Sequence, residues 1–463
     1  MPTRPHDAAQ ALPSPRARIW SSTRSILLFG ALAAALTIAW APGFTAPYQY
    51  DDYVTPLKDP ASQSLGRWWA ALPVTLRPLT KLSFAMESSA GLSAAPERRA
   101  FNWALFLGCA VLFALLLEAA GLRRAPAALI AALWGLHPVH AELVLALAGR
   151  SALLALALML GSALCLVHGR ARAALALAVA AVLARETAWP WLIVATGLTT
   201  AAARSWRARW APPLVAAILG GLLIFSSSRL QDLLAFAWSD PQAFDRIGLQ
   251  WAAVPHGSWL LVAAPRAFTV DMEFGPRGVQ RLLEILLAAL MYGGALWVGL
   301  GAQRPRMLRI GAWLWLCLVA PLHTAFPKLD PLTARSFSAS AAALLLLAVT
   351  AAVPFLAARP GLRRGLLPVG FALGLGLLGM TRAQAERYQD PIALWGDAAA
   401  HTEHATRPLI NLGTLLAQKG RLAEARLAMQ EAARRDARSS EARERLAAVD
   451  ALIEAQALIK EIK

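Results

Sequence analysis

Cysteine and charged residues are scarce in this sequence, and each shortage excludes a class of protein. Only 3 cysteines occur among 463 residues, and Cys109, Cys165 and Cys317 all stand inside apolar stretches. That placement indicates neither a disulfide framework nor a cysteine-based metal site. Charged residues make up 16% of the chain and hydrophobic residues 57%. This balance excludes an ordinary soluble protein of the same length.

Long apolar runs are what the sequence has instead. Stretches of about 16 to 23 apolar residues recur between short basic clusters, which is the pattern of membrane-spanning helices. We predict an all-α polytopic membrane bundle over residues 25–380 with about eleven spans. The expected spans are 25–43, 101–121, 125–137, 151–168, 173–184, 188–203, 211–228, 279–301, 311–326, 337–357 and 365–380. Two of them, 125–137 and 173–184, are too short to cross about 30 Å of hydrocarbon unaided, which favours a hollow outer face.

The distribution of arginine predicts the orientation. Residues 1–24 form a basic tail ahead of an uncleaved first span, and this tail and the alternate loops carry 17 arginines against Asp7 alone. The opposite loops, 44–100, 229–278 and 327–336, carry 12 basic and 11 acidic residues. The positive-inside rule then places the amino terminus in the cytoplasm of a bacterial inner membrane. To keep this parity, residues 251–270 are expected to enter and leave on the outer side, as an interfacial or re-entrant segment.

Composition changes abruptly after residue 380. Residues 381–463 are rich in alanine, arginine and glutamate and predict a soluble helical module, which parity places in the periplasm. Within it, Gly413, Gly420, Ala425 and Ala432 fit one tetratricopeptide repeat of two close-packed helices. One repeat is too short to be stable alone, so flanking helices, the membrane domain or a protein partner must cover its faces.

The first outer loop contains the adjacent acids Asp51 and Asp52. A carboxylate next to the end of the first span could act as a base, while an equally good interpretation is a pair that only solvates the loop. Arg77 follows in the same loop. It could bind phosphate, or it could extend along the membrane surface towards water.

A second candidate segment follows the third span, where His137, His140 and Glu142 precede Arg150. Ionisable groups at membrane depth are costly unless they face a cavity, so function is the default hypothesis for them. The two histidines and the glutamate could hold zinc, but Pro138 interrupts a regular helix between them. Hydrogen bonding to a substrate or phosphate is the preferred interpretation.

Further polar groups fall on the same predicted face. Arg185 and Glu186 separate two short apolar pieces, where they either form an internal salt bridge or direct the arginine towards a lipid phosphate. Asp271 follows the predicted re-entrant segment, and Arg335 precedes the tenth span. Topology alone predicts that these side chains converge.

Taken in order, these motifs resemble the transmembrane and tetratricopeptide-repeat O-mannosyltransferase family. The resemblance covers roughly residues 25 to 440, and its most specific part is the His-Pro-Val-His-Ala-Glu segment of 137–142 with Gly149 and Arg150. It implies a glycosyltransferase C-type fold and transfer of a sugar from a polyprenyl-phosphate donor to a hydroxyl of a protein or an envelope glycan. Inversion at the sugar carbon is expected. The resemblance implies no certain cofactor, leaves a divalent metal open, and implies no nucleic-acid partner.

The resemblance also implies roles for particular residues. Asp51 matches the catalytic base and Asp52 a helper or ligand beside it, while the cavity for donor phosphate and substrate would be lined by Arg77, His137, His140, Glu142, Arg150, Arg185, Glu186, Asp271 and Arg335. The family's Ser-Lys-Glu motif reads Ala-Arg-Glu over 184–186. Two rival functions are a non-catalytic scaffold whose tail binds an envelope partner and a transporter, which would predict inverted repeats that the sequence does not display.

Overall fold

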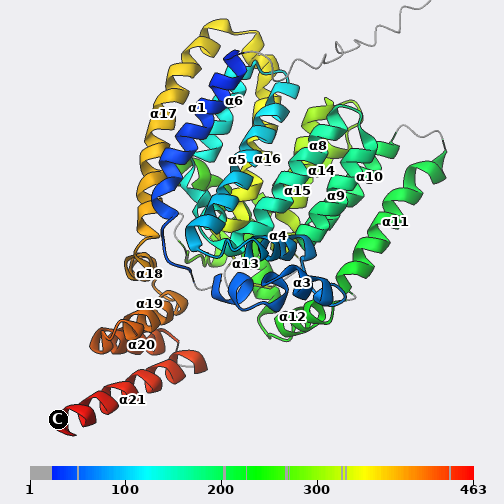
Figure 1. Ribbon diagram of the computed structural model, residues 1–463. Coiled ribbons are helices and arrows are strands. Elements are labelled where there is room, and N and C mark those ends of the chain that lie inside the picture. Colours follow the sequence, from blue (N-terminus) through cyan, green and yellow to red (C-terminus); the bar gives the residue numbers. More distant parts are fainter. Residues whose placement is uncertain are drawn as a thin grey trace, which may run out of the picture.

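A computed structural model describes residues 23–49, 52–201, 205–225, 227–265, 270, 272–324, 327–328, 331–436 and 439–462. Every regular element within these ranges is a helix, and none of the described residues forms a strand. The all-α prediction is therefore confirmed. Figure 1 shows an upright bundle of helices with four further helices, α18 to α21, hanging from one end.

Among the described residues, 7 helices are long and apolar enough to cross a membrane. They are α1 (Thr23–Trp40), α5 (Ala95–Ala119), α8 (Arg150–Val167), α14 (Gly278–Leu300), α15 (Arg306–Thr324), α16 (Ala334–Ala357) and α17 (Pro360–Arg387). An eighth would be the broken pair of α6 (Arg124–Gly135) and the segment Pro138–Val144, which bends by 59°. That segment consists of η4 (Pro138–His140) and α7 (Ala141–Val144).

The three remaining predicted spans are helical as well. They correspond to α9 (Ala171–Ala184), α10 (Trp189–Thr200) and α11 (Trp206–Phe225). Helix α9 is apolar but has only 14 residues. A helix therefore lies at each of the eleven predicted spans. Only 7 of these described helices, or 8 with the bent pair, have the length and composition of a full span.

The segment predicted to be interfacial or re-entrant, residues 251–270, is not among the described helices with the length and composition of a full span. Residues 251–263 of it belong to one continuous helix, α13 (Ala243–Ala263), which runs through Pro255. The expected reversal of direction is therefore absent from residues 251–263. Past the proline, Gly257 lies against the ring of Phe337 with no room for a Cβ atom, which would meet the ring at 2.4 Å.

Small residues set the close packing of the bundle. Ala174, Ala178 and Ala181 of α9 are fully buried in the main apolar core. Small side chains let helix backbones approach closely where the surroundings are apolar. By contrast, Leu282 and Leu290 of α14 point outward with 62% and 72% of their surface exposed. An outer face of this kind suits contact with lipid.

The tail contains the predicted helix pair, α19 (Arg407–Gln418) and α20 (Leu422–Arg435), flanked by α18 (Pro391–Ala400) and α21 (Ser440–Ile462). Gly420 makes the turn between the pair with a φ of 75°, which favours glycine. A Cβ at Gly413 would lie 2.9 Å from Met429 Cε and 3.2 Å from the Ala425 carbonyl oxygen, so the two helices pack closely there. Helix α18 packs on α19 and helix α21 on α20, so the flanking helices cover the pair, which is one of the three arrangements that the sequence left open.

The predicted outer loops gather at the end of the bundle that carries the tail (Figure 1). The first loop contains α3 (Leu65–Ala71) and α4 (Pro78–Ser89), and the second contains α12 (Ser228–Trp238). Contacts with the tail support this grouping. Gln389 Nε2 donates to the Pro42 carbonyl, and the His404 N–H donates to Glu273 at 2.9 Å. The loops therefore form one polar end of the molecule.

Candidate functional site

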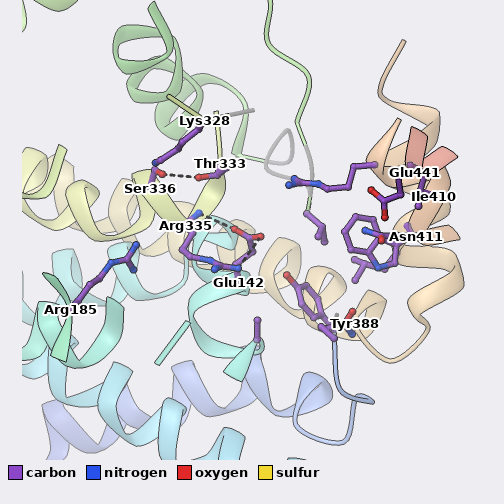
Figure 2. Close-up of a pocket in the computed structure, with 16 residues that line it drawn as sticks. Glu142, Arg185, Lys328, Thr333, Arg335, Ser336, Tyr388, Ile410, Asn411 and Glu441 are labelled. Carbon is purple, nitrogen blue, oxygen red and sulfur yellow. Dashed lines mark hydrogen bonds and ion pairs between the residues drawn. The ribbon is translucent and has the colours of Figure 1, made fainter. Parts of the chain in front are cut away.

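A cavity of about 500 Å³ lies where this polar end meets the tail. Figure 2 shows side chains from both parts facing one another across it. The membrane bundle contributes Glu142, Ala146 and Arg185, together with Lys328, Thr333, Arg335 and Ser336. The tail contributes residues of α18, α19 and α21. The cavity therefore draws its lining from segments that are far apart in the sequence.

Arg77 and Glu186 form a two-point ion pair close to this cavity. Arg77 Nε lies 2.7 Å from Glu186 Oε2, and the second guanidinium nitrogen contacts the other carboxylate oxygen. Burial alone would raise the pKa of Glu186, but hydrogen bonds from Arg77 and the charges of Arg77 and Arg185 lower it to about 2. The partner of Glu186 is thus Arg77, which replaces the internal Arg185 pair considered from the sequence.

The backbone of Arg77 is in an unusual conformation. Its φ of 58° makes it the non-glycine residue with positive φ among those described. It stands immediately before Pro78, which opens α4. Left-handed backbone costs free energy for an L residue and persists only where the surroundings hold it. Here the ion pair with Glu186 holds the side chain in place.

The pair predicts acid sensitivity. Because the pKa of Glu186 falls from its ordinary 4.5 to about 2 on folding, its ionised form stabilises the folded protein. That contribution is present above pH 4.5 and is lost as the pH falls from 4.5 towards 2. We expect thermal unfolding in detergent to show this loss, and Glu186→Gln to remove it. An unchanged acid dependence in Glu186→Gln would contradict the assignment.

Arg185 carries the least satisfied charge at the site. Burial and the positive charges of Arg77 and Arg335 lower its pKa to about 9, while Glu186 acts in the opposite sense. Its Nε–H is buried and has no hydrogen-bond acceptor. Buried polar groups nearly always have a partner, so this unpaired N–H leaves part of the Arg185 guanidinium unsatisfied beside the cavity.

Glu142 and Arg335 form the central contact of the cavity (Figure 2). The Arg335 backbone N–H donates to Glu142 Oε2 at 3.0 Å, and its guanidinium lies 3.9 Å from Oε1. Arg335 belongs to the first turn of α16, while Glu142 lies on α7 just after the break in the third span. Because the third span bends between α6 and residues 138–144, Glu142 lies next to Arg335.

The first loop carries the two adjacent acids, Asp51 and Asp52, that were predicted for the site. Asp51, the predicted base, lies outside the described residues. Asp52 is fully buried and accepts hydrogen bonds from the backbone N–H groups of Gln49 and Ala148, at 3.0 and 3.1 Å. Burial raises the pKa of Asp52, and those hydrogen bonds and the charge of Arg99 oppose the shift. Asp52 joins the loop to residues 147–148 and does not line the cavity.

The two histidines lie in the protein interior. His140 is fully buried, and its ring nitrogens are hydrogen-bonded to Ser338 Oγ and to the Trp134 carbonyl. His137 Nε2 lies 2.9 Å from the Leu261 carbonyl oxygen. Neither lines the cavity. Within the described ranges no group of three histidine, cysteine, aspartate or glutamate side chains could hold a metal ion.

Arg150 does not reach the cavity, in contrast to what the resemblance implies. Its side chain has 0% exposure and lies 2.7 Å from Glu87, a carboxylate of α4. It also donates to Asn102 Oδ1 at 2.7 Å, and the Phe84 ring centre lies 3.8 Å from its guanidinium carbon. Burial raises the pKa of Glu87, while the hydrogen bond and charge of Arg150 oppose that shift. Arg150 therefore stabilises the contact between α4, α5 and α8.

A stability prediction follows for Arg150. Arg150→Met leaves Glu87 buried without its cation, which typically costs about 3–5 kcal/mol. We expect a lower unfolding temperature in detergent, largely restored in Arg150→Met/Glu87→Gln. Arg426→Gln breaks the exposed pair with Asp450 and serves as a control with a cost of at most about 1 kcal/mol. Normal stability of Arg150→Met with loss of activity would contradict a structural role.

Several cavity residues were not predicted from the sequence. They include Gln49, Tyr388, Trp395, Arg407, Asn411 and Glu441. Most lie in the tail, which composition marks as a separate module. Asp271, which was predicted, lies outside the described residues, although the preceding Val270 lines the cavity. The one available signal was topology, because the predicted parity places tail and loops on the same side.

A narrow apolar crevice adjoins the arginines. It runs between α8, α15 and α16 and is lined by Leu156, Met159 and Leu318, among others. Arg185 and Arg335 line both this crevice and the polar cavity. The crevice holds only about 20 Å³, so Arg185 and Arg335 stand where a small apolar recess meets the polar cavity.

Comparison of the chain with protein-family models, with curated proteins and with solved structures gave no match.

Proposed function

We propose that the protein is a membrane glycosyltransferase that moves a sugar from a polyprenyl phosphate to a hydroxyl group of an envelope molecule. The carrying observation is the position of Arg185 and Arg335, which line both the polar cavity and the apolar crevice. A lipid-phosphate donor has this two-part character, since its phosphate is anionic and its chain is apolar. The order of sequence motifs, which resembles the O-mannosyltransferase family, supports the same proposal.

The proposed reaction is a direct displacement. The acceptor hydroxyl loses its proton to Asp51 as its oxygen bonds to the sugar carbon. The bond from that carbon to the phosphate oxygen breaks with its electron pair, which gives a free polyprenyl phosphate and inverts the carbon. Arg185 and Arg335 oppose the charge that develops on the phosphate. Fixed cations in a site that excludes water lower such a barrier more than they would in water.

In this proposal the cavity opens on the periplasmic side of a bacterial cytoplasmic membrane. The amino terminus lies in the cytoplasm and the tetratricopeptide-like tail in the periplasm. The imbalance of arginine between the two sets of loops supports that orientation. The gathering of the predicted outer loops and the tail at one end agrees with it.

The direct test compares cells with and without this chain. Intact-mass measurement of envelope proteins and sugar analysis of envelope polysaccharides should reveal one missing sugar, restored when the wild-type chain is supplied. The missing mass identifies the sugar and the class of acceptor. Identical protein masses and polysaccharide compositions in the two strains would refute transferase activity.

A second candidate is a non-catalytic scaffold whose tail, residues 381–463, binds an envelope protein. The internal use of three predicted site residues favours it, since Asp52, His140 and Arg150 all bond within the protein. A scaffold does not explain the unpaired Nε–H of Arg185 beside the cavity. Capture of a partner by the full chain, with Asp51 and Arg185 dispensable for its role in cells, would favour the scaffold.

A further inference from the structure

The cavity has two chemically different walls. The wall on the membrane bundle presents Arg185 and Arg335. The facing wall belongs to the tail, where α18 contributes Trp395 and α19 contributes Asn411. Tyr388 lies at the junction, directly after α17. The bundle wall therefore presents two arginines, whereas the tail wall presents one cation, Arg407, one acid, Glu441, and the uncharged polar side chains of Tyr388, Trp395 and Asn411.

Two aromatic side chains with a polar group line this second wall. Tyr388 and Trp395 line the cavity, although only 2% and 7% of each residue is exposed. Neither side chain hydrogen-bonds to another residue within the described part of the chain. Buried tyrosine and tryptophan normally find a partner for the O–H or N–H group. In Figure 2 the Tyr388 hydroxyl points towards Glu142, across the cavity.

Two amide side chains also line the cavity, one from the tail and one from the first loop, and each can both donate and accept hydrogen bonds. Asn411 and Gln49 line the cavity and bring side-chain amides to it. An amide matches a hydroxyl group, which also donates and accepts. A sugar presents several hydroxyls within a small volume, whereas a serine or threonine of a peptide presents one. Four uncharged polar side chains around one space therefore favour a polyhydroxylated ligand.

We propose that the tail wall is the acceptor subsite and that it binds a carbohydrate, so that the acceptor is a glycan rather than a protein. The inference rests on the proposed transferase function and adds the class of acceptor to it. The donor phosphate lies at Arg185 and Arg335, and the acceptor hydroxyl approaches from Tyr388, Trp395 and Asn411. A cavity of about 500 Å³ is within the usual range for binding sites, about 300–1,000 Å³.

The experiment supplies chain variants to cells that lack the chain and follows the affected sugar after induction. Tyr388→Phe removes only a hydroxyl, and Trp395→Phe removes the indole N–H. Tyr292→Phe is the matched control, because the Tyr292 hydroxyl is also buried without a partner but lies in α14 outside the cavity. Sugar is measured per milligram of envelope polysaccharide and, separately, as mass added to envelope proteins. Membrane abundance and unfolding temperature are measured for every variant.

We expect the sugar to appear in polysaccharide, with an initial rate reduced about tenfold by Tyr388→Phe or Trp395→Phe and unchanged by Tyr292→Phe. Appearance of the sugar on serine or threonine of a protein would overturn the carbohydrate acceptor and leave the transferase function intact. Wild-type rates in both cavity variants would overturn the subsite. If no sugar changes in either fraction, the transferase function itself fails.

Discussion

Asp51→Asn is expected to reduce sugar transfer by about 10²- to 10⁴-fold, which is the contribution of a positioned general base. Asparagine keeps the size of the side chain but cannot take the proton of the acceptor hydroxyl. The initial rate of transfer should therefore collapse while the amount of protein in the membrane stays constant. The measurement is sugar incorporation after induction, normalised to the abundance of the chain.

Substitution of the neighbouring Asp52 is the comparison for Asp51→Asn. Asp52→Asn places an amide NH₂ against one of the two backbone N–H groups that the carboxylate now accepts, so we expect lower stability. Asp232→Asn, at an exposed position of α12, should change neither rate nor stability. Full activity of Asp51→Asn would remove that residue from the mechanism. Equal effects of Asp51→Asn and Asp52→Asn on abundance would instead indicate a shared structural role.

Arg185→Gln should lower the rate of transfer by about 10²- to 10³-fold, the usual cost of removing one fixed donor to a developing negative charge. The fold should tolerate the change, because the guanidinium Nε–H has no acceptor to lose. Arg185→Lys retains the charge without the planar fork of donors and should retain more activity. Initial rates at saturating and at low donor concentration separate an effect on the chemical step from one on donor binding.

Arg67→Gln is the matched control for this series. Arg67 lies on α3 at the same polar end and is exposed, and it does not line the cavity. Its substitution should leave the rate within about twofold, since surface substitutions rarely have large effects. Equal losses in Arg67→Gln and Arg185→Gln would show that general charge at this end of the molecule matters and that a specific phosphate contact does not.

The helices of the bundle were predictable because an apolar helix is readable from composition alone. The third span shows a feature that composition does not predict. Its apolar run predicts one helix over 125–137, whereas α6 stops at Gly135 and the chain bends by 59° before residues 138–144. The proline at 138 signals an interruption, but its angle depends on packing against α16 and α17. The position of Glu142 depends on that angle.

The sequence predicted some of the cavity residues correctly and others wrongly. The difference between the two groups has a physical cause. Arg185, Glu142 and Arg335 were predicted and line the cavity. Arg150 was predicted from the same reasoning but is paired with Glu87, a carboxylate whose position could not be read from the sequence. An arginine near a membrane must find an anion, and the sequence does not say whether a ligand or the protein provides it.

The link between the bundle and the tail limits where this protein can act. Helix α17 ends at Arg387 and α18 begins at Pro391, so three residues join them. Three extended residues span roughly 10 Å. Asp390 also caps α18 through the N–H groups of Ile392 and Ala393, at 2.9 and 3.2 Å. A tail held so close cannot search the surrounding compartment for distant molecules, and an acceptor in the proposed reaction must itself come to the bilayer surface.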